Sequence, residues 1–287
     1  MKIISSACTD VGKARSNNED AFAICPDLTA GRWDQQTDYV PLGEWGLLSV
    51  VADGMGGPEA GEIASTIAIE AVRRSFSVEQ LKPVLGQNQE DIPGFLKTVF
   101  KRANDAIMQH VLANPDAIGM GTTLEVLWVI HGTAYIAWAG DSRCYVFNTD
   151  KGCLSRITKD HSSVQELVDR GELNPEEMMS HPDSNIITRG LGDIDVLYEP
   201  EIAVYPVTPG EIFLLCSDGL CGYCTDKEIE KVICKKLDSI PECCQALIDL
   251  ALDAGGEDNI TVSLVSTLQD NEVRHKSSWR IKIKKLF

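Results

Sequence analysis

The sequence predicts a layered α+β domain with antiparallel sheets. Short runs rich in Val, Ile, Thr and aromatic residues, bounded by Gly, Asp or Asn, are typical of strands. Other segments repeat apolar residues every three or four positions, as helices do. The strands bracket the helices without a regular strand–helix–strand alternation, which favours antiparallel sheets over a doubly wound parallel sheet.

Seven segments are predicted to be strands because they carry this composition between turn-forming residues. Two of them are joined by His131 and Gly132, a short connection typical of a β-hairpin. The predicted strands are 47–51, 122–130, 133–139, 143–147, 201–207, 211–216 and 259–265.

Four segments are predicted to be helices. In the first, Ile63, Ile67 and Ala71 recur at helical spacing, and Pro58 suits the first turn. The last is followed by Gly255 and Gly256, which signal the end of a helix. The predicted helices are 58–76, 95–111, 226–237 and 242–254.

Composition and charge exclude several classes of protein. The chain has 287 residues, with 26 Lys and Arg against 43 Asp and Glu, and a formal net charge of −17. A body this acidic repels phosphate backbones, so no nucleic-acid partner is expected. No apolar run approaches the roughly 20 residues of a transmembrane segment, and the start of the chain lacks the apolar stretch of a signal peptide. A cytoplasmic protein is therefore expected.

The end of the chain differs in charge from the rest. Residues 269–287 carry six Lys and Arg against two acidic residues. We therefore divide the chain into a domain over 1–268 and a basic tail over 269–287. The tail could touch an acidic partner or lipid headgroups, although a tail that is solvated or packs on its own domain is the simpler interpretation.

The ten cysteines do not suggest a disulfide framework, because a chain of this length needs no covalent staples and several of them fall in apolar stretches. Cys221 and Cys224 form a CxxC pair, and further cysteines follow. Their spacing is irregular for a structural zinc site, which is not favoured.

The most informative pattern is a series of acidic residues at the ends of predicted strands, beside Gly or Asn. Each alone is most often a turn residue. Adjacent strands ending in this way would gather carboxylates, which repel one another unless some are protonated or a cation joins them. Oxygen ligands alone favour Mg²⁺, Mn²⁺ or Ca²⁺, and the Gly54 carbonyl would add a further oxygen. The acidic positions are Glu19, Asp20, Asp53, Asp141, Asp218 and Asp258.

These motifs, taken in order, resemble those of the metal-dependent Ser/Thr protein phosphatases of type 2C (PPM class), bacterial type. The resemblance runs from about residue 5 to about residue 267. It implies a central antiparallel β-sandwich flanked by pairs of α-helices, a four-layer αββα fold. The matching segments are 15–20, 53–57, 121–123, 140–143, 188–192, 217–220 and 258–261.

The resemblance also implies roles for individual residues. A binuclear Mn²⁺ or Mg²⁺ centre would be held by the side chains of Asp20, Asp53, Asp218 and Asp258 and by the Gly54 carbonyl. Glu19 would reach a metal through water, Asp141 and Asp218 would hold a third, weaker ion, and Arg15 would bind the substrate phosphate. Two such ions, about 3.5–4 Å apart, can bridge one water, lower its pKa and direct the hydroxide in line at phosphorus. No phospho-enzyme intermediate is then required.

Two parts of the sequence are less regular. Met55 stands where many eukaryotic members of the family have a His proposed as general acid. His161 and His181 lie in the segment that resembles the family's flap, about residues 160–189. Either could donate a proton, and His161 is the candidate general acid, although a structural or surface role for both is the simpler interpretation. Residues 26–46 form an insertion that would either contact substrate or, the simpler expectation, cover the sandwich.

The sequence thus predicts a metal-dependent phosphatase acting on phosphoserine and phosphothreonine in proteins, its substrates being those of a Ser/Thr kinase. Two alternatives use the same residues. One is a pseudo-phosphatase that binds phosphoproteins without turnover. The other is a phosphohydrolase for small phosphate esters.

Overall fold

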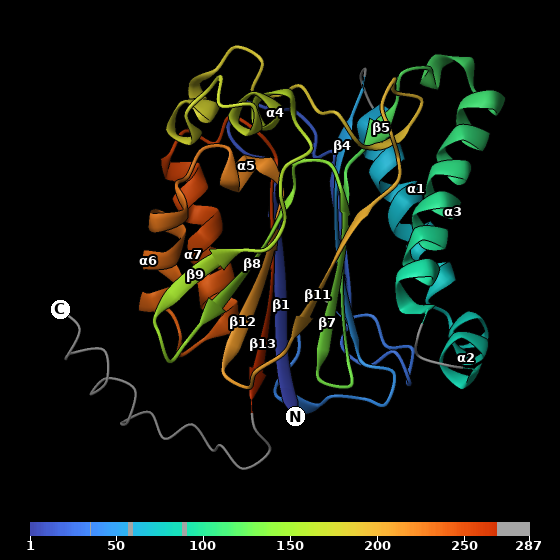
Figure 1. Ribbon diagram of the computed structural model, residues 1–287, viewed down its shortest axis with the longest axis vertical. Coiled ribbons are helices and arrows are strands. Elements are labelled where there is room, and N and C mark those ends of the chain that lie inside the picture. The colour runs from blue at the N-terminus through green and yellow to red at the C-terminus, as the bar shows by residue number, and fades with distance from the viewer. Residues whose placement is uncertain (35, 57–59, 88–90, 269–287) are drawn as a thin grey trace.

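The computed structural model describes residues 1–34, 36–56, 60–87 and 91–268. Two antiparallel sheets pack face to face, and helices cover the outer face of each sheet (Figure 1). This is the four-layer arrangement implied by the family resemblance. The predicted basic tail, 269–287, lies outside the described residues.

The first sheet brings the two ends of the domain together. Strand β1 pairs with β13 over nine residues, from Lys2 opposite Leu268 to Asp10 opposite Ile260. No strand was predicted at β1, where apolar residues do not alternate cleanly with polar ones. In spatial order this sheet contains β3 (Val40–Pro41), β1 (Lys2–Asp10), β13 (Ile260–Leu268), β12 (Glu211–Cys216), β8 (Arg143–Asn148) and β9 (Cys153–Arg156).

The second sheet contains the predicted hairpin. Strands β6 and β7 pair through a two-residue turn in which His131 and Gly132 both have positive φ, 48° and 75°. In spatial order this sheet contains β10 (Leu191–Gly192), β5 (Gly121–Thr122), β4 (Leu47–Met55), β6 (Leu124–Ile130), β7 (Thr133–Ala139) and β11 (Glu201–Pro206), and β2 (Asp20–Cys25) also pairs with β4.

The helices form two outer layers. On the second sheet lie α1 (Ala60–Ser75) and α3 (Ile92–Ala113), with α2 (Val78–Gln87) beside them (Figure 1). On the first sheet lie α6 (Asp226–Lys235) and α7 (Ile240–Asp253), with the short α5 (Asp218–Cys221) at the upper end. The remaining helical turns are η2 (Pro115–Ala117), α4 (Ser163–Asp169) and η3 (Pro175–Ser180).

Three apolar cores hold the four layers together. Between the sheets, Val51 and Leu127 of one sheet belong to the same buried cluster as Phe213 and Val265 of the other. The second core lies under α1 and α3, where Phe76 meets the ring of Trp128 edge to face at 5.1 Å. The third core lies under α6 and α7 and includes buried cysteines. Those cysteines are Cys216, Cys221, Cys224, Cys243 and Cys244.

The first predicted helix is confirmed, but only part of the apolar pattern that suggested it is buried. That pattern continues to Val72 and Phe76, which are buried, whereas Ile63 is 36% exposed. Ala60, Ala64 and Ala68 are buried against β4 and β2, where their small side chains let the helix approach the sheet closely. Pro58 lies outside the described residues.

The described part of the 26–46 insertion covers the lower end of the sandwich (Figure 1). Leu28 is buried in the core, the Trp33 ring packs under the Arg73 guanidinium, and β3 extends the first sheet. The Trp45 carbonyl accepts a hydrogen bond of 2.9 Å from Nε1 of Trp128. These contacts are those of a covering segment.

Among the helices that the structure describes, none combines the length and the apolar character needed to cross a membrane.

Candidate metal centre

The strand ends bring the predicted acidic residues to the upper end of the sandwich. Asp20 opens β2 and lies directly opposite Asp53 of β4, because the two strands are antiparallel. Asp218 follows β12 and opens α5, and Asp258 precedes β13. Asp141 follows β7 and faces the same cavity as Asp218. Five acids that are distant in sequence therefore gather in one region.

Hydroxyl groups position these acids. Ser217 Oγ donates to Asp20 Oδ2 at 2.7 Å and accepts from the backbone N–H of Thr261 at 2.9 Å. Thr123 Oγ1 accepts from the backbone N–H of Asp53 at 3.0 Å and lies 2.9 Å from Ser142 Oγ, beside Asp141. The carboxylates are thus fixed to the ends of both sheets.

The other oxygen of Asp20 is left over. Asp20 Oδ1 is buried and has no hydrogen-bond partner among the residues described. A buried carboxylate oxygen without a partner is what a group of acids shows when compensating positive charge is lacking.

Four of these acids have pKa values raised above those of ordinary aspartates. Burial raises the pKa of Asp20 to about 7, although the Ser217 and Thr261 hydroxyls oppose this, and nearby Asp218 and Asp258 add to it. Burial and then the charge of Asp258 raise the pKa of Asp218 to about 6. For Asp53, burial and repulsion by Asp20 raise the pKa well above its usual value. Burial and repulsion by Asp218 do the same to Asp141.

The remaining predicted ligands lie beside this group. The backbone N–H of Gly54 donates to the Glu19 carbonyl at 3.1 Å, and the N–H of Glu19 donates to Oδ1 of Asn259 at 2.8 Å. A Cβ on Gly54 would lie 2.1 Å from the Gly61 carbonyl oxygen, so only glycine lets β4 approach α1 here. Glu19 and Gly54 are therefore held together at the edge of the acidic group.

These residues fit a hard divalent cation by their chemistry. Within residues 1–34, 36–56, 60–87 and 91–268, no three His, Cys, Asp or Glu side chains already converge on one point as ligands. Asp258 instead bonds to Arg15. The donors are all oxygens, and an ion would satisfy Asp20 Oδ1.

Arg15 stands at the rim of the acidic group. Its Nη2 donates to Asp258 Oδ2 at 2.7 Å, and half of its side chain, 51%, is exposed. The loop that carries it is fastened to the loop before β13, since the N–H of Lys13 donates to the Gly256 carbonyl at 2.6 Å. Gly12, with φ 78°, is needed there because a Cβ would lie 2.2 Å from the Asp258 carbonyl oxygen.

Comparison with known proteins identifies the family. The family described as Protein phosphatase 2C matches residues 6–260. The chain belongs to the protein phosphatase 2C family. It is 34% identical over 257 residues to the serine/threonine phosphatase stp of Listeria innocua, covering 90% of this chain and 93% of that protein. The predicted resemblance is confirmed, and the chain is a protein phosphatase.

Solved structures of this family share the fold. The crystal structure of the Mycobacterium tuberculosis serine/threonine phosphatase PstP/Ppp matches with a TM-score of 0.77 and 33% identity, over 94% of this chain and 100% of that one. A structure of the PstP catalytic domain in complex with two manganese ions matches with a TM-score of 0.73 and 31% identity, over 94% and 100%. The predicted fold class is thereby confirmed.

In this 2C-type phosphatase a cavity of about 370 Å³ lies between the acidic group and the flap. Asp141 and Asp218 line one side of it, and Met178 and Met179 of η3 line the other.

The described residues that line this cavity do not include the two histidines of the flap. His161 is 7% exposed and stacks on the Trp138 ring. Its Nδ1 accepts from the Gly140 N–H at 3.2 Å, which leaves the ring proton on Nε2, 3.4 Å from Glu201 Oε1. Burial and then the charge of Arg189 lower its pKa. The general-acid role of His161 stays a prediction, and this placement favours a structural role instead.

The other two positions considered for protonation of the leaving group are His181 and Met55, and both contact nearby backbone. His181 Nδ1 accepts from the Asp183 N–H at 3.1 Å within the flap. Met55 ends β4 and lies opposite Gly121. Neither contact places a proton donor among the acids.

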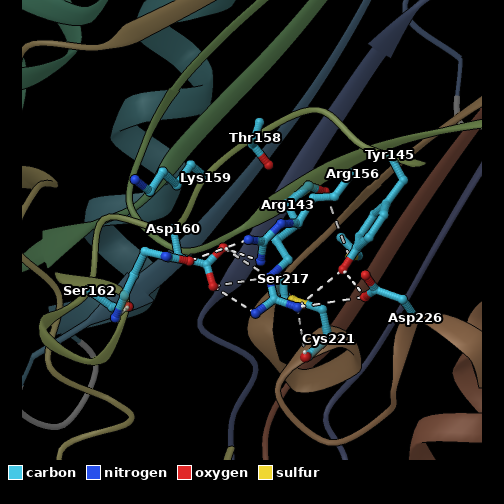
Figure 2. A network of polar contacts seen from close by, with 12 residues as sticks. Arg143, Tyr145, Arg156, Thr158, Lys159, Asp160, Ser162, Ser217, Cys221 and Asp226 are labelled. Carbon is cyan, nitrogen blue, oxygen red and sulfur yellow. Dashed lines mark hydrogen bonds and ion pairs between the residues drawn. The ribbon is translucent and has the colours of Figure 1, made fainter. Parts of the chain in front are cut away.

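Sequence reasoning missed one part of this end of the molecule. Arg143 ends the family-matching segment 140–143, but the sequence assigns it no role. Asp160 is predicted only as the start of the flap. The structure joins them in a network of polar contacts beside the cavity (Figure 2). An Arg in a β-strand that is otherwise apolar, Cys144 to Phe147, was the available signal.

Proposed function

We propose that the protein is a Mn²⁺- or Mg²⁺-dependent protein serine/threonine phosphatase whose metal ligands are the strand-end acids. The observation that supports this most directly is the group of acids with raised pKa values around Asp20 Oδ1, which has no hydrogen-bond partner in the part of the chain that the structure describes. The manganese in the PstP structure supports the choice of ion. The proposed ligands of two core ions are the Asp20, Asp53, Asp218 and Asp258 side chains and the Gly54 carbonyl, with Glu19 reaching an ion through water and Asp141 joining Asp218 at a third, weaker site.

The ions would supply a water molecule of lowered pKa as nucleophile and positive charge to offset that of the phosphate. The chain itself supplies orientation. Arg15 offers a planar pair of N–H groups to phosphate oxygens, and Asp258 holds that guanidinium at the rim. Ser217 and Thr123 hold the acids in place. No nucleophilic side chain is required, so hydrolysis would proceed by in-line attack without a phospho-enzyme.

The proposed substrates are proteins phosphorylated on serine or threonine by a Ser/Thr kinase. The name of the Listeria relative supports this class of substrate. All ten cysteines are free thiols, which supports a reducing compartment such as the cytoplasm. The proposed catalytic domain is 1–268, and the tail 269–287 is proposed to be a separate basic segment.

The test is Asp218→Asn, assayed for hydrolysis of 4-nitrophenyl phosphate with and without Mn²⁺. We expect the metal-stimulated rate to fall to background while circular dichroism stays native, because the amide cannot replace the carboxylate at the ions. Asp116→Asn, an exposed aspartate on η2, is the matched control and should keep the full rate. Wild-type turnover by the Asp218 variant would refute the proposed ligand set.

Two further assays on the same purified protein distinguish the phosphohydrolase and pseudo-phosphatase alternatives. A phosphopeptide panel is run against nucleotides and other small phosphate esters, and better turnover of the small esters would indicate a phosphohydrolase. Absence of divalent-ion binding by calorimetry, together with phosphopeptide binding, would indicate a pseudo-phosphatase.

A further inference from the structure

One guanidinium joins three separate segments at the upper end of the molecule (Figure 2). Arg143 donates to Asp160 from Nε, at 2.9 and 3.1 Å, and from Nη2, at 2.6 Å, which is a two-pronged ion pair. Its Nη1 donates to the Cys221 carbonyl and to the Tyr145 hydroxyl, both at 3.2 Å. Tyr145 in turn donates to Asp226 Oδ1 at 2.9 Å.

Each of the three segments leads to the acidic group or to the flap. Arg143 itself follows Asp141 by two residues at the start of β8. The Cys221 carbonyl belongs to α5, which opens with Asp218. Asp160 is the first residue of the flap segment 160–189. Arg143, Asp160, Asp141 and Asp218 all line the cavity of about 370 Å³.

The pair is buried, and its hydrogen-bonding groups are occupied. The Arg143 side chain is 14% exposed and that of Asp160 is 4% exposed. Breaking a buried pair by removing one partner leaves an uncompensated charge, so other arrangements of these segments are costly. Because Nε, Nη1 and Nη2 of Arg143 already donate to protein acceptors, this arginine is poorly suited to bind a phosphate.

We infer that the Arg143–Asp160 pair is a positioning device that holds the start of the flap in register with Asp141 and Asp218, and thereby sets the shape of the cavity that a phosphorylated peptide enters. The consequence for turnover rests on the proposed function. The positioning of the flap is a property of the chain alone and can be measured without it.

The chain offers a matched control. Arg156 also approaches Asp160, but at 3.5 Å from one nitrogen, and its side chain is twice as exposed, 28%. Arg156→Met therefore removes the same charge from the same partner, together with a hydrogen bond of 3.3 Å to Gln165 Oε1 of α4, without removing the two-pronged contact or the bonds to Tyr145 and Cys221. Arg143→Met and Asp160→Asn each break the pair from one side.

The first measurement is hydrogen–deuterium exchange of residues 161–189 in the metal-free protein. We expect exchange in the flap to rise about tenfold or more in Arg143→Met and Asp160→Asn. In Arg156→Met exchange should stay at the wild-type level outside α4, where Gln165 loses its bond to Arg156. The double variant Arg143→Met/Asp160→Asn should be no worse than the single ones, since both remove the same interaction. Flap exchange that is equal in Arg143→Met and Arg156→Met would overturn the inference.

The second measurement compares two substrates with Mn²⁺ present. For Arg143→Met we expect kcat/KM to fall by about 10- to 100-fold for a phosphopeptide and by much less for 4-nitrophenyl phosphate, which barely reaches the flap. An equal loss for both substrates with unchanged flap exchange would contradict positioning. If the wild type hydrolyses neither substrate, the proposed function fails and the exchange comparison still decides the inference.

Should Arg143→Met not fold, Asp160→Asn and Arg143→Lys decide the question. Lysine keeps the charge but cannot hold Asp160, Tyr145 and Cys221 together. Arg143→Lys should therefore show raised flap exchange, and full protection in both variants would refute the inference.

Discussion

Two groups of charged side chains border the same cavity and are balanced in opposite ways. In the strand-end group, which includes Asp20, Asp53 and Asp218, burial and the charges of neighbouring acids raise the pKa of each acid, and one oxygen of Asp20 lacks a partner within the described chain. The second group, which we call the flap-anchor group, consists of Arg143 and Asp160, whose side chains form a two-pronged ion pair. Acids around one cavity therefore have surroundings of opposite kind.

The difference shows what each group can do. A group whose charges are already paired gains nothing from an added ion and serves to fix the chain. A group of acids without compensating charge is costly until a cation or protons arrive. The imbalance, more than the number of carboxylates, distinguishes the candidate metal centre from its neighbour.

The largest effect on activity is expected from replacing Asp20, whose Oδ1 lacks a hydrogen-bond partner in the described chain. Asp20→Asn should reduce Mn²⁺-dependent hydrolysis by about 100-fold or more, since it removes a proposed ligand. It should also raise the melting temperature of the metal-free protein at pH 8, because a buried carboxylate no longer has to lose its proton. Steady-state kinetics and thermal melting of the same samples test both effects. A variant that is both active and less stable would contradict this account.

A smaller loss is expected at the rim. Arg15→Met should lower kcat/KM for phosphate esters by roughly 10- to 100-fold, the value of one or two charge-assisted hydrogen bonds. Arg15→Lys should recover part of the loss, because it restores the charge but not the planar fork. Kinetics at saturating Mn²⁺ separate this from weaker metal binding. Equal activity of all three proteins would remove Arg15 from the proposed phosphate site.

Glu125 extends the comparison, because it is an acid that lacks a hydrogen-bond partner in the described chain but is enclosed in the core. It is fully buried between the sheets, neither carboxyl oxygen has a hydrogen-bond partner in the described parts of the chain, and burial raises its pKa well above normal. Glu125→Met should stabilise the protein by about 1–3 kcal/mol in urea unfolding and leave activity unchanged. Destabilisation or lost activity would show that an enclosed acid also serves the site.

The smallest effect is a dependence of stability on pH. Asp20 and Asp218 have folded-state pKa values of about 7 and 6, above those of an unfolded chain, so they favour folding at low pH and this contribution is lost as the pH rises to about 7. The lowered pKa of His161 acts in the opposite direction, which reduces the net change. The metal-free protein should melt a few degrees lower at pH 8 than at pH 5.5, and Mn²⁺ should raise the melting temperature more at pH 8.

Asp53→Asn provides the control for this profile, since it weakens the repulsion within the group. Its melting temperature should vary less with pH than that of the wild type. An identical profile in both proteins would place the pH dependence elsewhere.

Much of this architecture could be predicted from sequence because its signals are local. The hairpin at His131 and Gly132 and the acids that end the strands can be found from short stretches of chain. The pairing of Arg143 with Asp160 could not, since neither residue indicates which partner it will meet. The buried position of Glu125 depends on its alternation with Leu127 and on the sheet that covers it. The exposed Ile63 shows the same limit, because close packing of α1 selected its alanines instead.

The long pairing of β1 with β13 has a consequence for biosynthesis. Arg15 follows the first strand and Asp258 precedes the last, and the two side chains bond to each other across the chain's sequence. A nascent polypeptide that has not yet released β13 from the ribosome lacks both the central strand of one sheet and the partner that orients Arg15. Partly synthesised or prematurely terminated copies would therefore be inert, so the cell is exposed to hydrolytic activity only from finished molecules.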